Sequence, residues 1–191
     1  MHPTEATLQY FANMLSELEQ YLLSPELYWP LSSRTASPTQ DRLTLGNILL
    51  SLDKINAVQQ TWDAQQNSMF RKSNLVWEQF LVKWKSAIER KAEHEMSSRT
   101  KLWHSYLSDL EAGQGAAFEY RREVRNRVII ERLFDLGISR DPWKDELQHL
   151  DMLTRSLVHP AEFMWPPALQ GQYPQKQYWF LYRIPRNADS Y

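Results

Sequence analysis

The stretch ERKAEHEMSSRTK, residues 89–101, decides how the middle of this 191-residue chain folds. It lies between two tryptophan-bearing segments, NLVWEQFLVKWKSAI and LWHSYLSDL, and it offers only Ala92 and Met96 to an apolar core. Such a polar stretch is compatible with a loop, a polar site or a helix exposed to solvent. The spacing of the residues on both sides of it distinguishes these alternatives.

One stripe of residues, apolar except for Arg99, passes through the stretch at helical spacing. Its members, three or four positions apart throughout, are Trp77, Leu81, Trp84, Ile88, Ala92, Met96, Arg99, Trp103, Tyr106 and Leu110. This period is close to that of a straight α-helix. We therefore expect one very long helix from the mid-seventies to about Glu111, ending before Gly113. The alternative is a break at Ser97 and Ser98, with a second helix capped there.

The length of this helix predicts an elongated molecule. A helix of about 40 residues is ~60 Å long, whereas a compact chain of this size has a diameter near ~42 Å. Because the contact seam is narrow, the charged residues beside it should lie in solvent. We expect this for Glu89, Lys91, Glu93 and Glu95.

Composition favours an all-α protein without a membrane span. Glycine is scarce, with five residues in all, which favours helix over β-rich folds. No run approaches eighteen apolar residues, and MHPTEATLQYF lacks a basic segment followed by an apolar one. There is no cysteine, so disulfides, thiol catalysis and thiolate metal sites are excluded. We expect a cytoplasmic protein with no membrane insertion.

Periodicity and helix-stop residues place the other helices. Ser24-Pro25 stops the first, Gly137 suits the position after the fourth, and Asp141-Pro142 opens the last, which Pro160 ends. A connector is expected over 24–40 and a reversal over 65–74. The expected helices span 4–22, about 41–65, about 116–136 and 141–159. The helix over about 116–136 is apolar all round in its second half.

The last 32 residues differ from the rest, since they hold half of the ten prolines and many aromatic residues. The run YWFLYRIP, residues 178–185, is apolar on both alternating faces, so as a strand it needs cover on two sides and a ladder partner. Because no other segment is a convincing strand, we expect it to pack on the helices or to pair with its copy in a second subunit. The residues expected at that interface are Tyr178, Trp179, Phe180 and Tyr182.

These expectations combine into one architecture. The fold class is all-α: an elongated antiparallel bundle of about five helices with one very long helix, plus an extended C-terminal tail rich in proline and aromatic residues. Residues 1–159 form the helical bundle domain. Residues 160–191 form the tail, packed on the bundle or on a second subunit.

Charge is unevenly distributed along the chain, although the net charge is only −1. Residues 71–132 carry thirteen basic and nine acidic side chains, and EYRREVRNRVIIERLF carries the densest cluster. A helix would place four arginines of this segment in one strip that could contact phosphate or an acidic partner. The four are Arg121, Arg122, Arg125 and Arg132. The alternative is a solvated face with intramolecular ion pairs.

Arg127 and Glu131 lie four positions apart at the edge of the expected core, so we expect a buried ion pair that Arg99 of the long helix joins. Glu146 and His149 have the spacing of one metal-binding motif, but di-iron bundles need two such motifs and further carboxylates. Glu89, Glu93 and His94 are better explained by ion pairs. We therefore expect no metal, no cofactor and no catalytic residue.

The function expected from these features is a non-enzymatic helical protein-interaction or assembly module that self-associates, as a dimer. The long helix and the strand without a partner motivate this hypothesis, and another protein partner is compatible with it. The alternative is a nucleic-acid-binding regulator using the arginine strip, although the overall charge makes nucleic acid the weaker partner. A second alternative is a metal-dependent or hydrolytic helical-bundle enzyme.

Overall fold

The computed structural model describes residues 3–32, 42–114 and 117–186, so much of the expected connector and the expected start of the fourth helix lie outside the described residues. Within the described ranges the chain is mostly α-helical, and the all-α class is confirmed. The chain divides into two compact units. The N-terminal unit holds residues 1–95 and 135–138, and the C-terminal unit holds residues 96–134 and 139–191.

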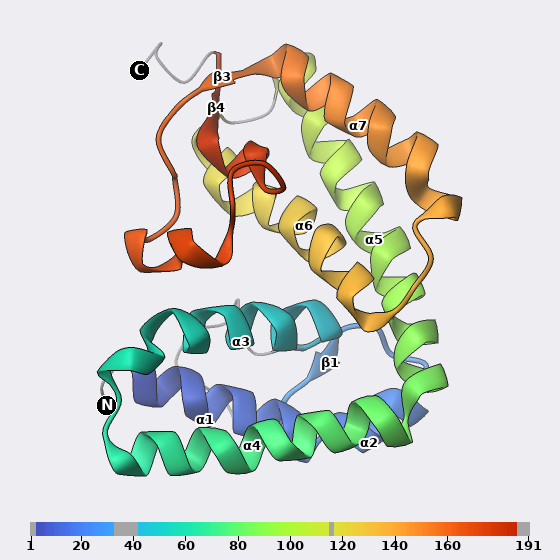
Figure 1. The fold of residues 1–191 in the computed structure, drawn as a ribbon. Coiled ribbons are helices and arrows are strands. Elements are labelled where there is room, and N and C mark those ends of the chain that lie inside the picture. Colours follow the sequence, from blue (N-terminus) through green and yellow to red (C-terminus); the bar gives the residue numbers. More distant parts are fainter. Residues whose placement is uncertain (1–2, 33–41, 115–116, 187–191) are drawn as a thin grey trace. The chain divides into compact units, whose positions relative to one another are not determined.

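In the N-terminal unit, helices pack around α1. Figure 1 shows α1 between α3 and α4, and it contacts both. The helices are α1 (Pro3–Ser16), α2 (Leu18–Leu23), α3 (Leu45–Val58), α4 (Ala64–Lys83) and the start of α5 (Lys85–Glu111). A short antiparallel pair, β1 (Trp29–Pro30) and β2 (Arg42–Leu43), precedes α3. Phe11, Leu18 and Ile48 are fully buried in the core of this unit.

The first expected helix is interrupted at Glu17, which separates α1 from α2. Glu17 has φ −106° and ψ 1°, outside the helical region. Its carboxylate accepts hydrogen bonds from Trp29 Nε1 at 2.8 Å and from the Ser32 backbone N–H at 2.9 Å. Tertiary contacts with the following segment therefore accompany a break where the sequence has neither proline nor glycine.

The reversal expected over residues 65–74 is wrong. The chain reverses earlier, between the end of α3 at Val58 and the start of α4 at Ala64. Asp63 caps α4 by accepting from the Gln66 backbone N–H at 2.8 Å, and the Gln66 side chain accepts from the Asp63 backbone N–H at 3.2 Å. This reciprocal capping box is recognisable in the sequence as Asp63-x-x-Gln66.

The polar stretch 89–101 is helix, as expected, because α5 runs unbroken from Lys85 to Glu111 past Ser97. The helix begins later than expected. Trp84, with φ −113° and ψ 23°, separates it from α4. The 27 residues of α5 span ~40 Å rather than ~60 Å. The helix length therefore no longer requires an elongated molecule, and elongation stays a prediction.

The C-terminal unit contains the rest of α5 together with α6 (Tyr120–Leu133), α7 (Lys144–Leu157) and a small antiparallel sheet of β3 (Val158–Pro160) and β4 (Arg183–Pro185). A 3-10 turn, Phe134–Leu136, extends α6, and Gly137 follows with φ 89°, as expected for a residue after a helix end. Another 3-10 turn, Asp141–Trp143, precedes α7, and no side chain caps that turn.

Aromatic packing joins α5 to α6 in this unit. The ring of Trp103 lies 5.7 Å from Tyr106 and 5.8 Å from Tyr120, measured between centroids. The second half of α6 is buried almost all round, from Asn126 to Leu133 with only Arg132 partly exposed. α6 is therefore the central helix that its sequence predicts.

The strand-like tail finds its ladder partner within the chain. β4 pairs with β3, with His159 opposite Ile184, while the residues before β4 form a 3-10 turn, Trp179–Tyr182. The expectation that no other segment is a convincing strand is therefore wrong. Val158–Pro160 was missed because it is short and directly follows α7. Pairing with a second subunit is not needed to satisfy this ladder.

Candidate functional site

Lys91 on α5 is buried, contrary to the expectation that it lies in solvent. Only 6% of the residue is exposed, and its ammonium group donates to the carbonyl oxygens of Ser24, at 2.9 Å, and Glu26, at 2.5 Å. The amine also lies 4.3 Å from the centre of the Tyr21 ring. Burial lowers the pKa of Lys91, and the nearby charge of Glu26 partly offsets this effect. Lys91 therefore binds the chain where α2 ends.

Glu95, one turn further along α5, is fully buried, so the expectation that it lies in solvent is also wrong. Its carboxylate accepts from the backbone N–H of Gly46 at 3.0 Å, in the first turn of α3. Thr44, the N-cap residue, accepts from Asn47 in the same turn. A carboxylate is favoured at this position because the first amides of a helix lack intrahelical partners and carry partial positive charge. The polar stretch thus supplies two helix-end contacts.

Arg99 and the pair Arg127–Glu131 were expected to form one buried cluster. Arg127 Nη1 does lie 3.3 Å from Glu131 Oε2, with both side chains less than one-tenth exposed. One contact of Arg99 is a hydrogen bond from its Nη1 to Asn126 Oδ1 at 3.1 Å. The structure therefore places Arg99 against α6, where it contacts Asn126, the residue that precedes Arg127 in the sequence.

Three residues that the sequence did not single out complete the Arg127 cluster. Asp151 of α7 accepts two hydrogen bonds from Arg127, at 2.9 and 3.0 Å, and Arg140 donates to Glu131 at 2.6 Å. Gln177 of the tail also donates to Glu131, at 3.2 Å. These contacts join α6, α7, the segment before α7 and the tail within the C-terminal unit.

The charges in this cluster stabilise one another against burial. Burial opposes ionisation of Glu131, but Arg140 and Arg127 outweigh it and hold its pKa below the usual value. Burial likewise opposes the charge on Arg127, and Asp151 and Glu131 outweigh it, so that its pKa is raised. A buried pair satisfied in this way favours one specific packing of its helices.

The arginine strip of α6 divides into exposed and partly buried members. Arg121 and Arg122 are exposed, whereas Arg125 and Arg132 are partly buried. Arg122 forms ion pairs with Glu119 and Glu123, each at 2.9 Å. Contact between this strip and nucleic acid stays a prediction.

The tail residues expected at an interface lie largely inside the C-terminal unit. Tyr178, Phe180 and Tyr182 are buried, and Trp179 is partly buried beneath the guanidinium group of Arg155, 3.8 Å from its ring centre. Tyr120 donates from its hydroxyl to the Phe180 carbonyl oxygen at 3.0 Å. Their aromatic surface is therefore used in the core of the same chain.

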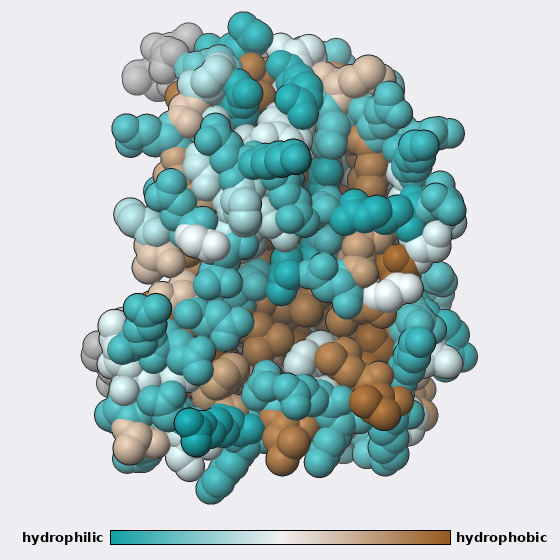
Figure 2. Space-filling view, viewed as in Figure 1, coloured by the Kyte–Doolittle hydropathy of each residue, from teal (hydrophilic) through white to brown (hydrophobic). Residues whose placement is uncertain are grey.

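Exposed apolar surface lies instead on α4. Although this helix has 20 residues, the described buried ones are only Phe70 and Trp77. Leu75 is 56% exposed and Val82 is 83% exposed. In Figure 2 hydrophobic surface interrupts the hydrophilic surface along the lower edge, where α4 runs in Figure 1. Periodicity did not predict this face, because its apolar residues lie off the stripe of Trp77 and Leu81.

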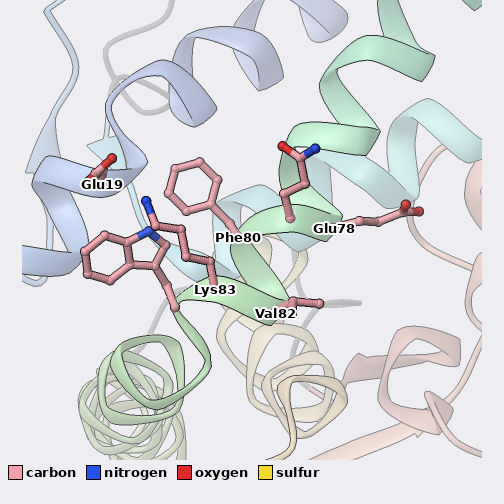
Figure 3. Close-up of a pocket in the computed structure, with 7 residues that line it drawn as sticks. Glu19, Glu78, Phe80, Val82 and Lys83 are labelled. Carbon is pink, nitrogen blue, oxygen red and sulfur yellow. The ribbon is translucent and has the colours of Figure 1, made fainter.

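A pocket of about 720 Å³ adjoins this face at the C-terminal end of α4. Its apolar wall is made by Phe80, Val82 and Trp84, and its polar rim by Glu19, Glu78, Gln79 and Lys83. In Figure 3, Phe80 and Lys83 extend toward Glu19 of α2, whereas Glu78 and Val82 extend to the other side of α4. The Lys83 amine lies 5.2 Å from the centre of the Trp84 ring. Such a wall with a charged rim suits an amphipathic side chain.

Metal-ligand candidates do not converge in the part of the chain that the structure describes. There, no group of three or more histidine and carboxylate side chains is placed to hold a metal ion. Glu146 and His149, which have metal-motif spacing, are both exposed on α7.

Comparison of the chain with protein-family models, with curated proteins and with solved structures finds no match. Across the described ranges, no helix has an 18-residue window apolar enough to cross a bilayer.

Proposed function

We propose that the chain is a non-enzymatic helical interaction module that forms a homodimer through the outer face of α4. The observation that carries this proposal is the exposure of Leu75 and Val82 on one helix. Residues seven positions apart in an α-helix point in nearly the same direction, about 20° apart. The two side chains therefore belong to one outward stripe.

Other residues of α4 indicate an interaction surface rather than isolated exposed apolar side chains. Single exposed apolar residues are normal on protein surfaces. Here, however, Val82 of the stripe also lines the pocket at the end of α4, whose apolar wall includes Phe80 and Trp84 and whose rim is polar. Apolar surface with a polar rim is typical of protein-interaction sites.

The charges of α4 favour an antiparallel pair of identical helices. Arg71 and Lys72 lie before Leu75, and Glu78 lies after it. If two copies cross at Leu75, Lys72 of one copy is level with Glu78 of the other, because both are three positions from the crossing. The helix dipoles also favour the antiparallel arrangement, because they point in opposite directions in such a pair. We therefore propose that a second copy of this chain binds the outer face of α4.

Light scattering coupled to size-exclusion chromatography tests this proposal. We expect a dimer at micromolar concentration, and we expect Val82→Glu and Leu75→Glu to shift the mass to the monomer because each places a charge in the interface. Phe118→Glu is the matched control, since Phe118 is 84% exposed but lies outside α4. A wild-type monomer at every concentration would refute the proposal, as would equal dissociation by Phe118→Glu.

We also propose a cytoplasmic location, on the ground that none of the 191 residues is cysteine, which fits a reducing compartment. Fractionation of cells that produce the protein checks this, and recovery outside the cytoplasm would contradict it.

A further inference from the structure

A second cavity of the N-terminal unit lies where the C-terminal end of α2 meets the first turns of α5, away from the outer stripe of α4. Its volume is about 430 Å³, within the range of small-molecule sites. Its apolar wall consists of Leu22, Leu23, Pro25 and Ala87. Leu23 is 68% exposed, so this wall has apolar area that the chain itself does not cover.

Three basic side chains of α5 line the same cavity, namely Arg90, Lys91 and His94. They lie within about 100° of one another around the helix axis, so they share one side of α5. Among the described residues that line the cavity, none is acidic. The cavity therefore combines an apolar wall with a basic edge.

The basic groups are available for a ligand to different extents. Arg90 and His94 are exposed, and neither makes a hydrogen bond or an ion pair with any residue in the described ranges. Lys91 is held by the carbonyls of Ser24 and Glu26, which use two of the three N–H groups of its ammonium. Arg90 and His94 are therefore the groups that would bind an anion, and Lys91 adds positive charge at the base of the site.

We propose that this cavity binds a small organic carboxylate whose apolar body lies against Leu22 and Leu23. An arginine fork matches the two oxygens of a carboxylate, and a hydrogen bond between two charged groups is stronger than a neutral one. The apolar wall selects for a ligand with a hydrocarbon part, because apolar area removed from water favours binding. This site is independent of the proposed dimer, since it uses no residue of the α4 stripe.

Calorimetric titration with four probes tests the assignment. Hexanoate carries both features, acetate lacks the hydrocarbon part, hexanol lacks the charge, and inorganic phosphate supplies charge without hydrocarbon. We expect hexanoate to bind in the millimolar range or tighter, at least about tenfold more tightly than each of the other probes. Equal binding of acetate, hexanol or phosphate, or no binding of hexanoate, would overturn the proposal.

Three variants locate the site. Arg90→Ala and His94→Ala should each weaken hexanoate binding about fivefold or more, because each removes a group that contacts the anion. Arg71→Ala is the charge-matched control, since Arg71 is exposed on α4 and does not line the cavity. If Arg71→Ala weakens binding as much as Arg90→Ala, the attraction comes from general surface charge and the proposal fails. Circular dichroism of each variant confirms that it is folded before titration.

Discussion

Lys91 and Glu95, one turn apart on α5, bind the ends of two different helices. Lys91 binds backbone carbonyls where α2 ends, and Glu95 binds a backbone amide where α3 begins. Each charge is opposite in sign to the partial charge at the helix end that it meets. A stretch that looks solvent-exposed in sequence therefore fastens α5 to two neighbours within the N-terminal unit.

Replacement of Glu95 measures the strength of that attachment. Glu95→Ala should lower the free energy of unfolding by about 1–3 kcal/mol, because it leaves the buried Gly46 amide without this partner. Urea denaturation followed by circular dichroism measures the change. Glu93→Ala, at an exposed position of the same helix, should cost less than about 0.5 kcal/mol. Equal effects of the two substitutions would contradict the capping role.

The pKa of Glu131 predicts how stability depends on pH. The pKa of Glu131 is lower in the folded chain than in the unfolded chain. Its contribution to folding stability is therefore fully present above its pKa in the unfolded chain, and it is lost as the pH falls through its pKa in the folded chain. Stability should therefore fall as the pH is lowered from about 5, and Glu131→Gln should flatten this fall. Glu146→Gln, at an exposed site, should keep the wild-type pH profile. Denaturant midpoints across this range give the comparison, and matching profiles for Glu131→Gln and the wild type would refute the prediction.

Asp151 balances a buried guanidinium group. Asp151→Asn should destabilise the chain by about 2–4 kcal/mol, because Arg127 keeps its charge but loses a carboxylate that accepts two of its hydrogen bonds. Asp145→Asn, at an exposed position on the same helix, is the matched control and should change stability by less than about 0.5 kcal/mol. Thermal unfolding of both variants checks the difference. A loss below about 1 kcal/mol for Asp151→Asn would show that Glu131 alone satisfies Arg127.

The tail should behave as part of the core of its own chain. Tyr120→Phe removes the buried hydroxyl that donates to the Phe180 carbonyl, so it should cost about 1–2 kcal/mol of stability. The mass measured by light scattering should stay unchanged, since this contact is intramolecular. A variant that loses mass but keeps its stability would instead place the tail at a subunit interface.

Much of the local structure follows from the sequence alone. The unbroken stripe from Ile88 to Leu110 predicts α5, because a helical period maintained through polar residues is sufficient to place one face against a core. Gly137 at positive φ and the central position of α6 were predictable for similarly local reasons. The pair Arg127–Glu131 follows from their spacing of four residues in a helix.

Tertiary structure alone decided where helices break and which charges are buried. Glu17 and Trp84 interrupt helices at positions without proline or glycine, so their own conformational preferences do not predict a break. The burial of Lys91, the pairing of β3 with β4 and the Asp151 contact of Arg127 likewise need partners distant in sequence. The physical reason is that periodicity records which face of a helix turns inward. Whether a polar group beside that face is buried depends on a backbone amide, carbonyl or opposite charge that only the folded chain brings within hydrogen-bond distance.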